Sequence, residues 1–491
     1  MTGADWVKVV VIFFSIVIFG YFILLSLAYL ILFGAAFLES RRYLKRSKSI
    51  DLREIFHSPL APSISVIIPA YNEEPIIVES VRAALELQYP RFEVVVVNDG
   101  STDATLARLA SEFKLKMVAR DVSRSVPSMG VRGAYISETH DNLVVVDKPN
   151  GGKADALNAG INVSRNDITC VVDADSLIEP DALLKIARPF IEEPETTVAA
   201  GGVIRIVNGC EVKDGAVTNV GLPRSYWANV QIVEYLRAFL GGRIGWSALH
   251  APLIVSGAFG GFDRRTILEI GGYRVGAVGE DMELVVRMHR YLRDAKRKYR
   301  MYFVPDPVCW TLAPTKYKQI ARQRDRWQRG LIETLMANQE MLLYPRYGAI
   351  GMLAMPFYFF FEMIGPLVEL SGYALVVAAG LTGQLGVHFL ILFLVVAVLF
   401  GVLISMIAVY LEGLMFQRYP KLRSLGKLAF YALVENLGYR QLNSWWRTKA
   451  YFTYYPRKAK WGEMDRTAYG VDTGAPAIVT DAEVSRPERT A

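Results

Sequence analysis

The sequence contains little cysteine and lacks the short nucleotide-binding motifs of many α/β proteins. Cys170, Cys210 and Cys309 are the three cysteines among 491 residues, and their spacing does not match a metal site. We therefore expect a reduced domain without disulfides. Residues 151–154 (GGKA) lack the spacing and the Ser or Thr of a Walker phosphate loop, and no GxGxxG opens the first crossover. These absences argue against a nucleoside-triphosphate hydrolase and a dinucleotide-binding Rossmann domain.

Long hydrophobic runs are present instead. The hydrophobic fraction is 52%, and residues 9–38 carry no charged side chain. At about 1.5 Å per helical residue this stretch exceeds a hydrocarbon core of about 30 Å, and it is too long for a signal peptide. We interpret it as a retained membrane anchor. The basic residues that follow predict a cytoplasmic location for the next domain; they are Arg41, Arg42, Lys45, Arg46 and Lys48.

Two further apolar stretches, residues 350–381 and 386–412, are expected to cross the membrane out and back. Residues 428–439 are too few to span, so we predict an interfacial or re-entrant segment and a cytoplasmic C-terminus. A fourth span fits the charges less well. Three tryptophans are expected at headgroup level, namely Trp445, Trp446 and Trp461. The expected localisation is the inner (plasma) membrane, multi-pass, with the domain after the anchor in the cytoplasm.

Charge and composition divide the chain into six parts. The net charge is +7, and much of the basic excess flanks the predicted spans, which favours anionic membrane lipid over nucleic acid as a partner. The predicted parts are an anchor with its basic flank (1–48), a cytoplasmic domain (49–312), interfacial helices (313–346), two transmembrane helices (347–412), a basic loop with the interfacial segment (413–464) and a disordered tail (465–491).

Short β-branched runs alternate with helical stretches between about residues 60 and 310. The first runs lie at 64–69, 94–97, 144–146 and 168–172, a pattern typical of parallel strands with crossover helices. Polar residues follow three of them. Because ligands of open α/β sheets bind at the carboxyl ends of the strands, we expect these polar residues to converge on one crevice.

The fourth run is followed by two carboxylates, Asp173 and Asp175. Like charges so close repel each other unless a cation neutralises them, and Mg²⁺ or Mn²⁺ that also binds substrate phosphates is the economical candidate. The alternative is a solvated turn, or the cap of a helix after Ser176.

Asp281 is the best candidate for a general base. It follows a glycine-rich loop (Gly271, Gly272, Gly276 and Gly279) and begins an amphipathic helix. A carboxylate within hydrogen-bond reach can deprotonate a sugar hydroxyl. Glu280 is a competing candidate, and a mere helix cap is the alternative role of Asp281.

Other polar residues are suited to a nucleotide and its sugar. Asp99 could accept hydrogen bonds from a base edge, Tyr71 could stack on the base, Glu73 could bind the base or ribose, and Lys153 could counter phosphate charge. The alternative is ordinary turn residues and a surface lysine. In residues 323–327 (QRDRW), the amide of Gln323, the guanidinium of Arg326 and the indole of Trp327 suit a diphosphate and a sugar ring.

Together these motifs resemble the processive, membrane-integrated family 2 glycosyltransferases, which include cellulose, chitin, hyaluronan and poly-N-acetylglucosamine synthases. The matching segments lie at 68–73, 97–101, 152–158, 173–175, 279–281 and 323–327. The resemblance implies an α/β GT-A fold with a mixed, mostly parallel sheet, plus transmembrane and interfacial α-helices. It also implies an inverting mechanism, a UDP-sugar donor with a divalent metal, and a β-linked product.

Carried over residue by residue, the resemblance assigns roles to the site. Tyr71, Glu73, Asp99 and Lys153 would hold the uridine and its phosphates, and Asp173 and Asp175 the metal-diphosphate. Asp281 would be the base, Gln323 and Arg326 would contact the donor diphosphate, and Trp327 would support the acceptor sugar. Gly279 stands where many relatives have Thr, and Asn98 where several have Asp. Ser256 and Gly257, in an acceptor-side segment, favour an N-acetylglucosamine-type polymer.

Glu362 and Glu369 lie seven residues apart in the second apolar stretch, so on a helix they share a face. Our hypothesis is that they line a passage for the growing glycan with Tyr358; the alternative is a position at the cytoplasmic rim or pairing with Arg440 or Arg447. Three spans are few for a channel, which is compatible with an auxiliary membrane subunit or a homo-oligomer. Rival functions are transfer of a single sugar to a membrane lipid and an inactive scaffold.

Overall fold

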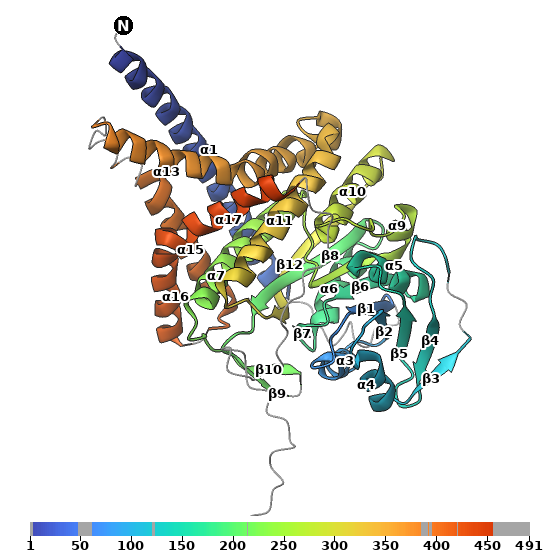
Figure 1. Cartoon of the computed structure of the whole chain (residues 1–491). Coiled ribbons are helices and arrows are strands. Elements are labelled where there is room, and N and C mark those ends of the chain that lie inside the picture. Colours follow the sequence, from blue (N-terminus) through green and yellow to red (C-terminus); the bar gives the residue numbers. More distant parts are fainter. Residues whose placement is uncertain are drawn as a thin grey trace, which may run out of the picture. The chain divides into compact units, whose positions relative to one another are not determined.

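The computed structural model describes residues 3–47, 61–119, 123–213, 215–383, 391, 395–419 and 421–454 (Figure 1). The chain forms two compact units. We call the first the helical unit; it comprises Met1–Leu44, Val230–Leu253 and Lys316–Lys460. The second, the α/β unit, comprises Lys45–Asn229, Ile254–Thr315 and Trp461–Ala491. The disordered tail predicted at 465–491 lies outside the described residues.

The α/β unit is built on a ten-stranded sheet with the order β3-β4-β5-β2-β1-β6-β11-β8-β12-β7. Pairing is parallel through β5-β2-β1-β6 and between β8 and β12, and antiparallel elsewhere. The strands are β1 (Ile64–Ala70), β2 (Phe92–Asp99), β3 (Leu115–Val118), β4 (Gly133–Ser137), β5 (Leu143–Lys148), β6 (Ile168–Val172), β7 (Ser176–Ile178), β8 (Thr197–Ile206), β11 (Phe259–Asp263) and β12 (Arg300–Thr311). A separate hairpin joins β9 (Glu211–Lys213) to β10 (Ala216–Asn219). The predicted α/β class with a mixed sheet is confirmed.

The four strands predicted from apolar runs all form. Strands β1, β2, β5 and β6 are buried along most of their length, as expected for parallel strands covered on both faces. Helices lie beside this sheet (Figure 1). They are α3 (Ile77–Leu85), α4 (Thr105–Glu112), α5 (Lys153–Val163), α6 (Ala182–Glu192), α9 (Arg264–Glu269) and α10 (Glu280–Asp294).

One alternative of the sequence analysis is wrong. No helix begins after Ser176: this residue opens strand β7, which pairs antiparallel with β12, and α6 begins only at Ala182. Asp173 and Asp175 therefore lie in a tight strand-to-strand connection and do not cap a helix.

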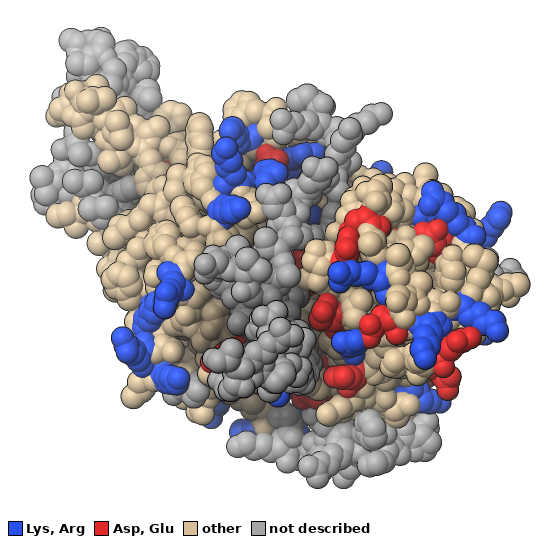
Figure 2. All heavy atoms as spheres, turned by 60° about the horizontal axis from the view of Figure 1, so that its bottom comes forward, with Lys and Arg blue, Asp and Glu red and all other residues tan. Residues whose placement is uncertain are grey.

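The helical unit begins with α1 (Gly3–Ser47), the one helix among the described residues that alone is long and apolar enough to cross a membrane. Exposed apolar side chains cover its described part, including Phe13 and Ile16. Helices η1 (Arg237–Arg243) and α8 (Ile244–Ala248) pack closely on it: a Cβ added at Gly245 would lie 2.5 Å from the Leu32 carbonyl oxygen. On the face drawn in Figure 2, broad areas carry no charged side chain, whereas elsewhere acidic and basic side chains are interspersed.

The second apolar stretch, which we predicted to cross the membrane, forms a bent pair of helical segments. Helices η4 (Ile350–Ala354), α12 (Met355–Phe357) and η5 (Tyr358–Met363) precede α13 (Gly365–Leu381), and the two halves are bent by 41°. Pro366 lies in the first turn of α13, where its missing N–H breaks the preceding hydrogen-bond ladder. The pair is long and apolar enough for one broken span or a re-entrant loop.

The rest of the helical unit is also interrupted. Part of the third predicted span, 386–412, lies outside the described residues; its described part forms η6 (Val395–Leu399) and α15 (Phe400–Leu411), followed by η7 (Glu412–Phe416). The predicted interfacial segment, 428–439, comprises the second half of α16 (Leu422–Val434) and η8 (Glu435–Tyr439), in which Leu437 and Gly438 are non-helical. Helix α17 (Arg440–Thr453) follows it. The helix that carries residues 323–327 is α11 (Tyr317–Ala337), and the short turns η2 (Gln339–Met341) and η3 (Pro345–Tyr347) follow it.

Candidate active site

The carboxyl ends of β1, β2 and β6 lie at one edge of the sheet, because these three strands are parallel neighbours. The loops after β1 and β2 are joined by side chains. The backbone N–H of Asn72 donates to the Ser101 hydroxyl (3.0 Å), and the backbone N–H of Glu73 donates to Thr105 Oγ1 (2.9 Å). Glu73 is buried and Tyr71 is exposed, so Tyr71 is the one of the two that is open to stacking.

Lys153 is the centre of the charged cluster, and the surface-lysine alternative is wrong. Its side chain is 8% exposed, and its Nζ lies 2.6 Å from Asp173 Oδ1 and 3.2 Å from Glu280 Oε1. It also donates to the Gly257 carbonyl oxygen at 3.3 Å. Burial alone would lower the pKa of Lys153, but the charges of Asp173 and Glu280 outweigh this effect and raise it above its ordinary value. The ammonium therefore stays charged and ties the end of β6 to the start of α10.

Asp281 lies in the first turn of α10, beside the segment that contains Ser256 and Gly257. Its Oδ2 accepts the Gly257 N–H at 3.1 Å and its Oδ1 accepts the Met282 N–H at 2.8 Å. The residue at the cap position of α10 is Gly279, so Asp281 is not the cap residue. A Cβ at Gly257 would lie 3.3 Å from Asp281 Oδ2, which shows how closely this backbone approaches the carboxylate. The structure thus brings together the predicted base and two of the predicted acceptor-side residues.

Asp173 and Asp175 are the residues that could hold a metal ion. Both are partly exposed, and 29% of the Asp173 side chain is open to solvent. Within the described ranges, no group of three or more His, Cys, Asp or Glu side chains could hold an ion. Mg²⁺ is typically bound through one or two carboxylates, with waters and substrate phosphates completing the coordination. Two partly exposed carboxylates therefore fit an ion that arrives with a diphosphate.

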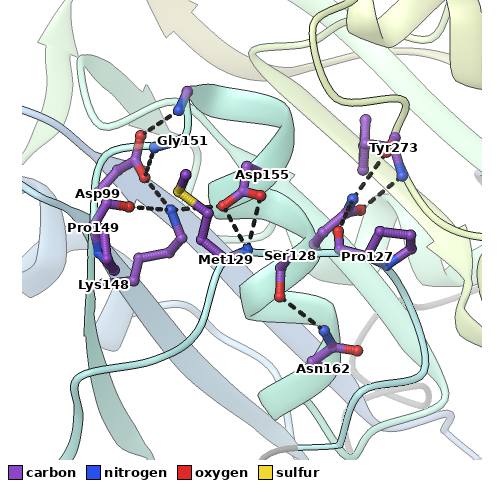
Figure 3. A network of polar contacts seen from close by, with 12 residues as sticks. Asp99, Pro127, Ser128, Met129, Lys148, Pro149, Gly151, Asp155, Asn162 and Tyr273 are labelled. Atoms are coloured by element: carbon purple, nitrogen blue, oxygen red, sulfur yellow. Dashed lines mark hydrogen bonds and ion pairs between the residues drawn. The ribbon is translucent and has the colours of Figure 1, made fainter.

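Asp99 is not open at the sheet edge as we expected. It is buried, and its two oxygens accept the backbone N–H groups of Gly151 (3.0 Å) and Gly152 (2.8 Å) (Figure 3). The ammonium of Lys148 binds the same carboxylate. In this structure Asp99 therefore holds the turn that leads into α5; its contact with a base edge stays a prediction.

Residues 323–327 lie on α11, and they present one exposed ring. Trp327 is 43% exposed, and the Gln323 Oε1 atom is buried without a hydrogen-bond partner in the described part of the chain. The guanidinium carbon of Arg324 lies 4.4 Å from the centroid of the Trp327 ring. The unpaired amide oxygen of Gln323 and the Trp327 ring, which Arg324 supports, are both suited to a polar ligand that carries a sugar.

Sequence reasoning missed Arg324 and the two residues that hold it. Its Nη2 lies 2.7 Å from Glu234 Oε2 and 3.1 Å from the Tyr439 hydroxyl. The spacing of three residues between Arg324 and Trp327 on a helix is a signal that could have indicated their contact. The contributions of Glu234 and Tyr439 depend on the tertiary fold and leave no local pattern.

The two carboxylates of the second apolar stretch are paired, as the alternative in the sequence analysis proposed. Arg440 Nε donates to Glu369 Oε1 (2.9 Å), and Arg447 Nη2 lies 3.2 Å from Glu362 Oε2. These two arginines, like the two glutamates, are seven residues apart, on α17. Tyr358, the third residue proposed for a passage, lies in η5. A role of the three in glycan passage stays a prediction.

Two family models match parts of this chain. A family model described as "Glycosyltransferase like family 2" matches residues 61–330, and one described as "Chitin synthase" matches residues 275–418. The probable glycosyltransferase YdaM of Bacillus subtilis is 29% identical over 324 residues, covering 63% of this chain and 65% of that protein. The poly-beta-1,6-N-acetyl-D-glucosamine synthase of Staphylococcus epidermidis is 27% identical over 278 residues, 56% of this chain and 55% of that protein. The chain thus spans less than two thirds of the length of these relatives.

Among solved structures, the mannosyltransferase PcManGT of Pyrobaculum calidifontis, in complex with GDP-Man and Mn²⁺, aligns with a TM-score of 0.48 and 21% identity, over 86% of this chain and 99% of that one. The first family model covers more than half of the chain and includes the strand ends, Asp173, Asp281 and residues 323–327. The family model confirms the predicted family resemblance and the glycosyltransferase class. This chain belongs to the family 2 glycosyltransferases.

Proposed function

We propose that this protein is an inverting glycosyltransferase that uses a UDP-sugar and a divalent metal ion to extend a β-linked polysaccharide. The observation that carries the proposal is the cluster around Lys153, in which Asp173 and Glu280 contact one buried ammonium and Asp281 lies beside Gly257. Such a site combines a carboxylate that can bind a cation, Asp173, with one that can accept a proton, Asp281. The donor diphosphate requires the cation, and the acceptor hydroxyl requires the proton acceptor.

Asp281 acts as the general base in the proposed reaction. Its carboxylate takes the proton of the acceptor hydroxyl, whose oxygen forms a bond to the anomeric carbon from the face opposite UDP. The bond between that carbon and the β-phosphate oxygen breaks, and its electron pair leaves with UDP. Attack from the opposite face inverts an α-linked donor to a β-linked product.

Charge on the departing diphosphate is the main electrostatic problem of this reaction. Lys153 and Arg326 supply positive charge, and Gln323 supplies an amide for the same group. Asp173 and Asp175 would hold Mg²⁺ or Mn²⁺, which supplies Lewis-acid stabilisation of the leaving phosphate when bound. Tyr71, Glu73 and Asp99 are assigned to the uridine. Trp327, Ser256 and Gly257 are assigned to the acceptor sugar, which they orient.

The polymer is proposed to be of the N-acetylglucosamine type and to pass across the membrane. The poly-beta-1,6-N-acetyl-D-glucosamine synthase among the relatives and the Ser256-Gly257 segment support the sugar class. The N-terminal helix α1 and the bent pair at 350–381 support a multi-pass membrane location with a cytoplasmic α/β unit. Passage would involve Glu362, Glu369 and Tyr358, together with an auxiliary subunit or further copies of the chain.

Incubation of membranes containing the protein with radiolabelled UDP-sugars tests the proposal. We expect a long product from UDP-N-acetylglucosamine, resolved on a gel and degraded by a hydrolase specific for its β-linkage. Membranes containing Asp281→Asn are the control and should form product at least about a hundredfold more slowly. A labelled species of one sugar that extracts into organic solvent would support transfer to a lipid instead. No incorporation from any UDP-sugar would contradict the donor class.

A further inference from the structure

A fully buried lysine, Lys148, binds the carboxylate of Asp99 (Figure 3). It is the last residue of β5, and its Nζ binds Asp99 Oδ1, lies 2.7 Å from Asp155 Oδ1 and donates to the Pro149 carbonyl oxygen at 2.6 Å. All three donor positions of the ammonium are therefore used. Sequence reasoning did not find Lys148.

The buried group carries more negative than positive charge. Two carboxylates, Asp99 and Asp155, share one ammonium, and backbone N–H groups stabilise the remaining charge. Gly151 and Gly152 donate to Asp99, and Met129 donates to Asp155 Oδ2 at 3.0 Å. Asp155 also lies in the first turn of α5, where the helix dipole favours an anion. Lys148 thus holds together two carboxylates that would otherwise repel each other.

Two positions of the turn that these carboxylates hold require glycine. Gly152 has φ +88°, and a Cβ added at Gly151 would lie 2.6 Å from the Asp155 carboxyl carbon. The turn ends at Lys153, the first residue of α5, whose ammonium contacts Asp173 and Glu280. The position of the site lysine therefore depends on the Asp99–Lys148–Asp155 group.

The same helix face extends this support away from the site. Asn158 donates to the Pro127 carbonyl oxygen (2.8 Å) and accepts the Tyr273 N–H (2.7 Å), and Asn162 accepts the Val126 N–H (3.0 Å). These side chains follow Asp155 at helical spacing, so one face of α5 binds the segment 126–129 and the glycine-rich loop (Figure 3).

We propose that Lys148 is a positioning residue for donor binding: with Asp99 and Asp155 it fixes the 149–153 turn so that Lys153 meets the donor diphosphate. This proposal rests on the proposed function, because it assumes a nucleotide-diphosphate donor. Lys148 itself contacts no donor. Its removal should weaken nucleotide binding in a protein that is still folded, which distinguishes positioning from a purely structural contribution.

Two variants separate these effects. Lys148→Met removes the ammonium and leaves two carboxylates facing each other, so it lowers thermal stability as well as binding. Lys148→Met combined with Asp155→Asn has the same net charge in this group as the wild type, so it regains stability but lacks the ammonium that ties Asp99. Lys185→Met is the matched control, because Lys185 is a buried lysine of α6 that pairs with Asp181 at 2.6 Å and is assigned no role at the donor site.

Binding of UDP with Mn²⁺ is measured by calorimetry on the detergent-solubilised full chain, together with thermal unfolding and the KM and kcat for the sugar donor. We expect the double variant to unfold near the wild-type temperature and to bind UDP about tenfold or more weakly, with KM raised more than kcat is lowered. Lys185→Met should bind normally. Recovery of both stability and UDP binding in the double variant would overturn the proposal. Wild-type protein that binds no UDP would overturn the proposed donor class, and the positioning role with it.

Discussion

The ion pairs of four glutamates in the helical unit differ from the two lysine-centred groups of the α/β unit. In the helical unit each of four glutamates has its own arginine; the pairs are Glu234–Arg324, Glu362–Arg447, Glu369–Arg440 and Glu435–Arg237. In the α/β unit two lysines each serve two carboxylates. Lys148 is shared by Asp99 and Asp155, and Lys153 by Asp173 and Glu280.

The difference follows from the surroundings of each unit. A charge in an apolar helical unit is costly unless it is neutralised, and one arginine per glutamate achieves this. The α/β unit retains excess negative charge at the edge of its sheet, where Asp281 adds a further carboxylate. Such an excess is suited to a cationic ligand. The five predictions below test this comparison.

Loss of the base carboxylate should have the largest effect. Asp281→Asn keeps the size of the side chain but cannot accept the acceptor proton, so we expect kcat to fall by about 10²–10⁴-fold with UDP binding retained. Initial rates and UDP titrations check this. Glu280→Gln is the matched variant, since Glu280 competes for the role; a larger loss of kcat in Glu280→Gln than in Asp281→Asn would reassign the base.

Breaking one pair in the helical unit should cost stability more than activity. Glu369→Gln leaves the partly buried Arg440 without its carboxylate. Removal of one partner of a fully buried pair costs about 3–5 kcal/mol, and we expect a smaller loss here because Arg440 is partly solvated. Thermal unfolding in detergent measures this. The double change Glu369→Leu with Arg440→Leu should recover much of the loss.

The single changes Glu362→Leu and Glu369→Leu test the proposed glycan passage. Unaltered polymer length and secretion in both variants would contradict it.

The excess negative charge of the α/β unit should appear as a metal requirement. Chelation with EDTA should abolish transfer, and added Mn²⁺ should restore it. Asp173→Asn removes one charged ligand, and we expect the Mn²⁺ concentration for half-maximal activity to rise about tenfold or more. Asp181→Asn, a carboxylate next to a lysine on α6, is the control. Activity of Asp173→Asn at wild-type Mn²⁺ concentrations would show that Asp173 holds no ion.

Much of the fold and part of the site could be predicted from the sequence, because their signals are local. The apolar run at 168–172 predicted a strand, and the polar residues at its end predicted Asp173 as a site residue. The glycine-rich loop and amphipathic helix indicated Asp281 in the same way. These signals lie within a few residues of the side chain that they identify.

Other features depend on contacts between distant segments. Lys148 ends an ordinary valine-rich strand, and its importance comes from Asp99 and Asp155, which approach it only in the folded sheet. Asp99 likewise reads as an open turn residue until Gly151 and Gly152 cover it. The bend before α13 had a local signal in Pro366, but the apolar composition of residues 350–381 outweighed it.

Replacement of Arg324 by lysine tests a pair of the helical unit that also supports an aromatic ring. Arg324→Lys keeps the charge for Glu234 but loses the planar group 4.4 Å from the Trp327 ring. We expect KM for the acceptor to rise about two- to fivefold, since such a contact is worth about 0.5–1 kcal/mol. Arg237→Lys is the control, because that arginine pairs with Glu435. Equal acceptor KM values for both variants would show that the stack does not support binding.

The three cysteines of the α/β unit are buried thiols, and burial is the main cause of their pKa shifts. Burial raises the pKa of Cys210 to about 11 and that of Cys170 and Cys309 above the ordinary range, so all three thiols stay neutral. We expect iodoacetamide at pH 8 to modify none of them in the native protein and all of them in urea, as read by mass spectrometry.

Because an unfolded thiol ionises at about pH 8.5, each cysteine favours unfolding as the pH rises above that value. For Cys210 this loss extends to about pH 11, and Cys210→Ser should reduce it, measured as a smaller fall in the urea midpoint between pH 8 and pH 10. An equal fall in wild type and variant would mean that Cys210 titrates alike in both states, and that burial in this unit does not keep it neutral.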